Sequence, residues 1–136
     1  MEQDGAPVEQ LMTTGVFTVT PETPVVDAAD TLRSEGIGSL VVVDEDEQPV
    51  GMLTTTDCAT IVSTGEVESD ATVERYMTDH LVTIGRQNTI RDAAAKMMTH
   101  GVHHLPVTDE RRGVVGILST MDLTAYLSYT AGTETE

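Results

Sequence analysis

The phrase GMLTTTD at residues 51–57 returns as GILSTMD at residues 116–122, 65 positions further along the chain. Each copy has a glycine, two apolar residues and a hydroxyl residue, followed by two further residues and an aspartate. Apolar residues before a Ser or Thr that has an acid three positions later are typical of a strand that leads into a helix. The recurrence of this strand-to-helix phrase indicates that one structural unit is present twice.

The similarity between the two parts of the chain extends far beyond this phrase. Residues 8–64 align with residues 73–129 without a gap when the sequence is shifted by 65 positions. Identical pairs are spread along the whole alignment and include Val8/Val73, Met12/Met77, Asp27/Asp92, Gly36/Gly101, Gly51/Gly116 and Asp57/Asp122. A gapless match of this length predicts two structurally equivalent halves.

Each half predicts a β-α-β-β-α order of elements after a short helical leader. The expected strands are residues 16–19, 40–44 and 50–53 in the first half and residues 81–84, 105–109 and 114–118 in the second. Thr23 and Asn88 are the expected N-caps of the first helices, which Gly36 and Gly101 should end. The expected fold class is α/β (α+β). Neither half, at about 57 residues, buries enough surface alone, so we expect the repeats to pack with pseudo-twofold symmetry.

The expected domain organisation follows the repeats. Residues 1–6 form an N-terminal tail, 7–64 the first repeat, 65–71 (GEVESDA) a linker, 72–129 the second repeat and 130–136 an acidic C-terminal tail. The polar start of the chain does not resemble a signal peptide, and no apolar run approaches the roughly 20 residues of a membrane span. A single cysteine allows no internal disulfide, which fits a reducing compartment. We therefore expect a soluble, cytoplasmic protein.

The charge is strongly unbalanced, because seven Lys and Arg stand against 23 Asp and Glu, giving a formal net charge of −16. Nucleic acids and anionic membranes bind through basic patches, so neither is an expected partner. At about 1 M salt the Debye length is only about 3 Å, and repulsion between carboxylates is then largely screened. We interpret the acidity as the adaptation of a halophile's protein to concentrated salt.

Two interpretations of the repeated phrase remain open. In the first, it is a capping box, in which the hydroxyl and the acid bond to free backbone N–H groups of the helix. Aspartate is shorter than the usual glutamate and should make a poor box. In the second, the helix N-terminus and the hydroxyl bind a phosphate, while Asp57 or Asp122 accepts hydrogen bonds from a ribose diol.

The whole pattern resembles a tandem pair of CBS (cystathionine-beta-synthase) domains over about residues 7–129. The resemblance rests on MT-x4-T near each first strand, DAA in each first helix, GIGSLVVVD and GVHHLPVTD, and then the repeated phrase. It implies a regulatory module, not an enzyme, that binds AMP, ADP or ATP, with S-adenosylmethionine or NAD as further candidates. It also implies a homodimer formed through the CBS pairs and an unidentified regulated protein. A ligand-independent dimerisation or scaffold module is the alternative.

Carried onto this sequence, the resemblance implies two composite pockets, each with one side from either repeat. The first would use Phe17, Thr18, Val19 and Ile37 together with His104, Ile117, Ser119 and Asp122. The mirror pocket would use Val82, Thr83, Ile84 and Val102 together with Ser39, Met52, Thr54 and Asp57. Because His104 would supply a cation where the other copy has Ser39, we expect the first pocket to bind more tightly. Arg111 and Arg112 are expected as a solvated turn, with assistance to the phosphate as the alternative.

The remaining chemically active side chains predict no further site. His100, His103 and His104 form a cluster, but Gly101 interrupts the helix between them, so we expect no metal. No nucleophile has a base at recognisable spacing, and no glycine-rich phosphate loop occurs, so we expect no catalysis. Cys58 lies on an apolar helix face and is expected to be a buried thiol.

Overall fold

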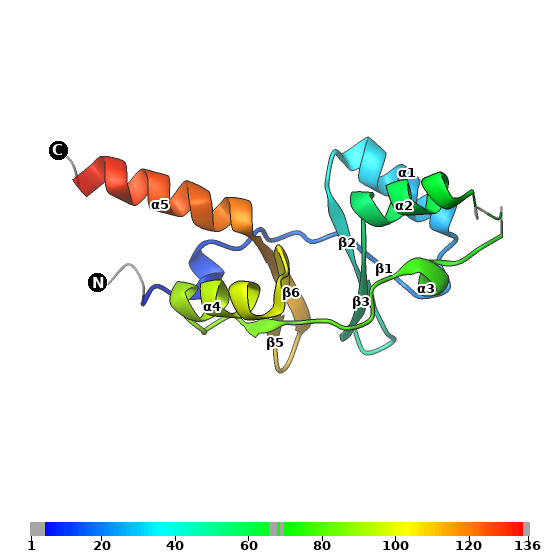
Figure 1. The fold of residues 1–136 in the computed structure, drawn as a ribbon. Helices are drawn as coiled ribbons and strands as arrows, with labels where there is room; N and C mark the ends of the chain where they lie inside the picture. The colour runs from blue at the N-terminus through cyan, green and yellow to red at the C-terminus, as the bar shows by residue number, and fades with distance from the viewer. Residues whose placement is uncertain (1–4, 66–67, 69, 135–136) are drawn as a thin grey trace. The chain divides into compact units, whose positions relative to one another are not determined.

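The computed structural model describes residues 5–65, 68 and 70–134. Its elements follow the β-α-β-β-α order in each half, so the prediction of two α/β repeats is confirmed (Figure 1). The chain folds as two compact units. One is Phe17–Leu81, and the other joins the residues up to Val16 to those from Val82 onward. Each unit is built around one three-stranded sheet.

The unit Phe17–Leu81 packs its helices against the sheet β1-β2-β3. Its elements are β1 (Thr18–Val19), α1 (Val25–Glu35), β2 (Ser39–Val43), β3 (Pro49–Thr54), α2 (Thr55–Thr64) and α3 (Val73–Tyr76). β1 runs parallel to β2, whereas β2 and β3 form an antiparallel hairpin. Val25, Ala28 and Leu32 recur at helical spacing along α1, and this face packs in one core with β2 and β3.

The other unit repeats this topology with the sheet β4-β5-β6. Its elements are η1 (Val8–Gln10), β4 (Ile84–Gly85), α4 (Ile90–His100), β5 (His104–Asp109), β6 (Gly113–Ser119) and α5 (Thr120–Glu134). β4 is parallel to β5, and β5 pairs with β6 antiparallel. Ala93 and Met97 of α4 pack with Leu105 of β5 in the core of this unit. Since α5 continues to Glu134, residues 130–134 of the expected C-terminal tail are helical.

The first helix of each repeat has its N-cap one residue later than expected. The N-cap of α1 is Pro24, which has no side-chain hydrogen bond. The N-cap of α4 is Thr89, whose hydroxyl accepts a hydrogen bond from the backbone N–H of Asp92 at 3.1 Å. Asn88 instead accepts a hydrogen bond from the backbone N–H three residues before it, also at 3.1 Å. The side chain of Asn88 is thus bonded to the preceding turn, and Thr89, the next residue, caps the helix.

The predicted ends of these two helices are confirmed. Gly36 follows α1 with φ 65°, and Gly101 follows α4 with φ 64°. Both values lie in the left-handed region, which glycine adopts without the strain that a Cβ would cause. After each glycine the chain enters the central strand of the sheet in its own unit.

The leader of each repeat is the short helix at its start with the residues that follow it, up to Val16 in the first repeat and up to Leu81 in the second. Each leader packs against the sheet that the other repeat forms. Thr13, which follows η1, pairs with Ile117 of β6 through two backbone hydrogen bonds of 2.9 and 3.0 Å. Thr78, which follows α3, pairs with Met52 of β3 through two bonds of 2.9 Å. The sequence repeats therefore do not coincide with the spatial units, because each unit combines the leader of one repeat with the body of the other.

The glycine of the repeated phrase leaves room for these leaders. A Cβ at Gly116 would lie 2.5 Å from Met12 Sδ and 3.0 Å from the backbone oxygen of Thr13. A Cβ at Gly51 would likewise lie 2.5 Å from Met77 Sδ. Neither glycine has a positive φ. The close approach of the leader, and not the backbone conformation, therefore requires glycine at both positions.

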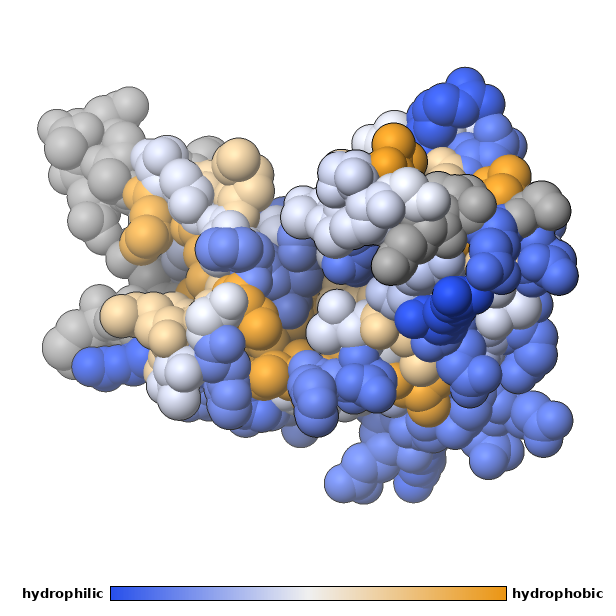
Figure 2. All heavy atoms as spheres, turned by 45° about the vertical axis from the view of Figure 1, so that its right-hand side comes forward, coloured by the Kyte–Doolittle hydropathy of each residue, from blue (hydrophilic) through white to orange (hydrophobic). Residues whose placement is uncertain are grey.

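Hydrophilic residues cover much of the face drawn in Figure 2, as the composition leads one to expect. None of the helices in the described residues combines the length and the apolar composition that a bilayer span needs. Parts of the expected tails and linker lie outside the described residues, namely residues 1–4, 66, 67, 69 and 135–136.

Candidate functional site

The hydroxyl residue of each repeated phrase lies where a hairpin strand passes into a helix. In one unit, Ser119 ends β6 directly before α5 and stands opposite His104 in the β5–β6 register. In the other unit, Thr54 ends β3 directly before α2 and stands opposite Ser39. Each unit thus carries the predicted ribose- and phosphate-binding side of one pocket on one hairpin and the helix that follows it. These residues are His104, Ile117, Ser119 and Asp122 in the first unit, and Ser39, Met52, Thr54 and Asp57 in the second.

Both phrases form complete capping boxes. Oδ2 of Asp122 accepts a hydrogen bond from Ser119 N–H at 2.9 Å, and Ser119 Oγ accepts one from Asp122 N–H at 3.1 Å. Asp57 and Thr54 form the same two bonds at 2.9 and 3.1 Å. The expectation of a poor box is wrong. With φ −116° and ψ 165°, the extended backbone of Thr54 brings its N–H within reach of the short carboxylate.

Capping uses only one oxygen of each carboxylate. Within the part of the chain that the structure describes, Oδ1 of Asp57 and Oδ1 of Asp122 accept no hydrogen bond. A carboxylate offers about four lone-pair positions. The two interpretations of the phrase are therefore compatible, because the box fixes the side chain while its second oxygen can accept a hydrogen bond from a ligand hydroxyl.

His104 is partly buried where β5 begins. Burial lowers the pKa of its imidazole below the ordinary value of 6.5, and His103 lowers it further, whereas Asp122 acts in the opposite direction. His104 is therefore mainly neutral at neutral pH in the ligand-free protein. The ligand-free protein therefore offers less positive charge at His104 than the sequence-based expectation assumed. A neutral imidazole still donates one hydrogen bond, and a bound phosphate would favour its protonated form.

We expect His104 to make the protein easier to unfold in mild acid. Its folded-state pKa lies below the unfolded value of about 6.5, so the unfolded chain binds more protons in this window. The stabilisation is complete above about pH 6.5 and is lost as the pH falls through the folded-state pKa. His104→Gln should make the dependence of the unfolding free energy on pH shallower, by at most about 1.4 kcal/mol per pH unit, the limit for one proton.

Urea denaturation between about pH 7.5 and about pH 5 measures this slope. The matched control is His80→Gln, because the His80 side chain is fully exposed at 100%. If His104→Gln keeps the wild-type slope, the burial of His104 does not hold its imidazole neutral.

The surroundings of the histidine cluster and of the cysteine follow from the described residues. Over residues 5–65, 68 and 70–134, no three His, Cys, Asp or Glu side chains are placed to hold a metal ion. Cys58 is only partly buried and lies at the edge of the core, whereas the sequence predicted a buried thiol. Burial raises the pKa of its thiol, and Asp57 raises it further. The thiol therefore stays protonated at neutral pH and is a weak nucleophile.

The remaining predicted pocket residues differ in exposure. Phe17 is 42% exposed, whereas Ile84 is only 2% exposed and its side chain packs in the core of its unit. The carbonyl of Thr83 accepts a hydrogen bond from Lys96 Nζ at 2.7 Å. Thr18 is exposed, and the partly buried members are Val19, Ile37, Val82 and Val102. The two sides of each predicted pocket belong to different units. That these two sides together form one pocket stays a prediction.

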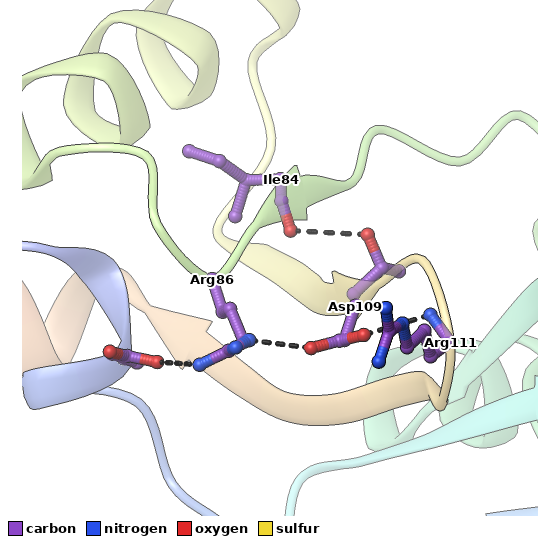
Figure 3. Close-up of polar contacts among 6 residues, drawn as sticks. Ile84, Arg86, Asp109 and Arg111 are labelled. Atoms are coloured by element: carbon purple, nitrogen blue, oxygen red, sulfur yellow. Dashed lines mark hydrogen bonds and ion pairs between the residues drawn. The ribbon is translucent and has the colours of Figure 1, made fainter.

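Arg86 is a residue that the sequence did not single out (Figure 3). Its Nε donates to Asp109 Oδ2 at 2.5 Å, and its Nη1 donates to Glu9 Oε2 at 2.6 Å. Because Glu9 belongs to η1, these bonds tie the leader to the turn after β4 and to the end of β5. The first repeat has Pro21 at the equivalent position. This difference between otherwise matching halves is the signal that could have identified Arg86.

Arg111 and Arg112 lie at the opposite end of the hairpin from the predicted phosphate position. His104 pairs with Ser119 where β5 begins, whereas Asp109 lies where β5 ends, beside the turn that holds both arginines. Six residues of antiparallel strand span about 17 Å. The alternative in which these arginines assist a phosphate at Ser119 is therefore wrong.

Comparison with known proteins identifies the family of the two repeats. The CBS domain family model matches residues 8–64 and 73–129. A 17.7 kDa protein of Acidianus ambivalens is 33% identical over 116 residues, which are 85% of this chain and 70% of the relative. A homoserine O-acetyltransferase of Methanosalsum zhilinae is 32% identical over 116 residues, which are 85% of this chain but 23% of the enzyme.

A solved structure shares the fold closely. The CBS domain pair of protein MJ0100, in complex with 5′-methylthioadenosine and S-adenosyl-L-methionine, superposes with a TM-score of 0.82 and 26% identity. The match covers 92% of this chain and 98% of that chain. The resemblance to a tandem CBS pair is confirmed, because the family model matches each repeat along nearly its whole length. This chain belongs to the CBS domain family.

Proposed function

We propose that this chain is a regulatory module that binds an adenosyl ligand at the junction of β6 and α5. The observation that carries the proposal is the state of Asp122, whose carboxylate is fixed by the capping box while its Oδ1 accepts no hydrogen bond from the described residues. The similar CBS pair of MJ0100 binds two adenosyl compounds, which supports this ligand class. AMP, ADP and ATP are our first candidates, followed by S-adenosylmethionine and NAD.

Each polar group at this junction has a distinct part in the proposal. Asp122 Oδ1 accepts a hydrogen bond from the ribose diol. Ser119 Oγ already accepts the Asp122 N–H at 3.1 Å, but its own O–H is a donor that can bind a phosphate oxygen. His104, opposite Ser119, supplies a second donor. The equivalent junction has Ser39 in place of this histidine, so we propose that it binds the ligand more weakly.

The regulatory output follows from the exchanged leader. Ile117 holds Thr13 through both of its backbone polar groups and lies two residues before Ser119 on the same strand. A ligand that contacts Ile117 and Ser119 therefore lies beside the attachment of the leader. We propose that the ligand changes how firmly the leader is held. It can do so only to the extent that it binds the two states with different affinity.

The capping boxes also favour a second candidate, a ligand-independent dimerisation module. In that case the hydroxyl and carboxylate of each phrase have a structural role alone. Large apolar side chains stand exposed on the helices, with Val62 of α2 at 71%, Met98 of α4 at 84% and Met121 of α5 at 71%. Such side chains would suit contact with a second copy of the chain.

Thermal shift and calorimetry with the five candidate ligands distinguish the two functions. An adenosyl ligand present at about a hundred times its Kd should raise the free energy of unfolding by about 2.7 kcal/mol. GMP is the matched control, because it keeps the ribose and the phosphate and changes only the base. Stabilisation by an adenosyl compound but not by GMP supports the nucleotide module. No response to any of the five supports the scaffold.

A further inference from the structure

An open groove lies between two turns of the unit that contains β4, β5 and β6. Residues 85–88, after β4, form one wall, and residues 108–112, at the tip of the β5–β6 hairpin, form the other. Its volume is about 470 Å³, which falls within the range of small-molecule sites, roughly 300–1,000 Å³. Neither wall contains a residue of the predicted adenosyl sites, so the groove needs its own explanation.

The groove brings three arginines together with two acids, Asp109 and Glu110, on a strongly acidic chain. Arg86, Arg111 and Arg112 line it, and they are three of the six arginines in a protein with a formal net charge of −16. In the first repeat the positions equivalent to Arg111 and Arg112 hold Asp46 and Glu47. The first repeat shows that this hairpin tip can be acidic in the same fold. The arginine pair is therefore not a requirement of the turn.

One of the two carboxylates that line the groove, that of Asp109, is already engaged, and the other, Glu110, is exposed. Asp109 Oδ1 accepts the backbone N–H of Arg111 at 2.8 Å, and Oδ2 accepts Arg86 Nε (Figure 3). These hydrogen bonds, from the Arg111 backbone first, lower the pKa of the Asp109 carboxyl. Arg86 is in turn held by Glu9. Both Arg111 and Arg112 are exposed, and their guanidinium groups form no ion pair within the described residues.

We propose that this groove binds the phosphate group of a small ligand. The guanidinium groups of Arg111 and Arg112 supply the charge, because their paired N–H donors match the geometry of phosphate oxygens. Gln87, on the facing wall, supplies a neutral amide donor, whereas the amide of Asn88 already bonds to Gly85 and Asp92. Arg86 keeps its bonds to Glu9 and Asp109 and fixes the distance between the two walls.

This site is separate from the proposed adenosyl site. The groove lies at the end of β5, whereas His104 and Ser119 lie at its beginning, about 17 Å away for six residues of strand. Ligands that carry phosphate but no nucleoside therefore test the groove by itself. Inorganic phosphate and pyrophosphate are the probes, and sulfate distinguishes a response to phosphate chemistry from a response to any divalent anion.

The experiment compares Arg111→Gln/Arg112→Gln with wild type by calorimetry and by amide chemical shifts, at constant ionic strength in KCl. We expect saturable binding of pyrophosphate that weakens by about tenfold or more in the double variant. The shifts should concentrate in residues 85–88 and 108–112. Arg33→Gln/Arg91→Gln is the matched control, since it removes the same number of charges from exposed arginines of α1 and α4 outside the groove, and it should bind as wild type does.

Four outcomes would overturn the proposal. The first is the absence of saturable binding by either phosphate probe. The second is unchanged affinity in Arg111→Gln/Arg112→Gln. The third is an equal loss in Arg33→Gln/Arg91→Gln, which would show a general effect of net charge. The fourth is equally tight binding of sulfate. Because both substituted side chains are exposed, loss of the fold would not account for a weaker binding signal.

Discussion

Gly116→Ala should lower the free energy of unfolding by about 2 kcal/mol, a typical cost of overpacking a tight contact. The added Cβ would lie 2.5 Å from Met12 Sδ, 2.8 Å from Met12 Cγ and 3.0 Å from the backbone oxygen of Thr13. The methionine side chain can rotate away, but the oxygen is held by the 3.0 Å hydrogen bond from Ile117 N–H. The leader must therefore shift or leave the edge of β6. Urea denaturation of the variant measures the loss.

Gly38→Ala is the matched control for this substitution. A Cβ at Gly38 meets no atom within 4 Å, and the residue does not have a positive φ. Alanine there should leave stability unchanged or raise it by about 0.5 kcal/mol, because it restricts the unfolded chain. In the double variant Met12→Ala/Gly116→Ala, the loss of unfolding free energy should be smaller than the sum of the two single losses. The reason is that Met12→Ala removes the side chain nearest to the added Cβ. If Gly116→Ala is as stable as Gly38→Ala, the leader does not pack on this glycine.

The exchange of leaders could not have been predicted from the sequence, although the elements could. Alternating apolar segments, glycines after the helices and the repeated phrase were sufficient for the β-α-β-β-α order, because each signal is local. The partner of a leader is not a local property. Met12 and Met77 occupy equivalent positions, and so do Gly51 and Gly116. Packing a leader on its own repeat or on the other one therefore satisfies the same pattern.

In the candidate site, too, the features that depend on local sequence could be predicted, and those that depend on burial or on distant residues could not. The spacing of Ser119 and Asp122 predicted a helix start with both groups at its first turn, and the structure has this arrangement. The lowered pKa of His104 could not be predicted, because burial is its largest cause and the sequence does not give burial. Arg86 was missed because its partners Glu9 and Asp109 lie 77 and 23 residues away in the sequence.

Asp122→Asn should weaken the tighter adenosyl-binding event by about thirtyfold, while the fold is retained. The amide oxygen of asparagine can still accept the hydrogen bond from Ser119 N–H, and Ser119 Oγ can still accept the backbone N–H of residue 122. The loss of charge at the helix N-terminus should therefore cost at most about 1 kcal/mol of stability. The ribose diol, by contrast, loses a charged acceptor worth about 2 kcal/mol, which is about thirtyfold in Kd.

Asp57→Asn provides the matched control, because Asp57 caps α2 with the same two distances, 2.9 and 3.1 Å, but faces a junction that has Ser39 where the other has His104. Calorimetric titration of both variants with AMP compares them directly. Asp57→Asn should leave the tighter event within about twofold of wild type, since each carboxylate acts at its own junction. The reverse order would place the stronger site at Thr54 and Asp57. Wild-type affinity in both variants, with both melting temperatures lowered, would leave the two aspartates as helix caps alone.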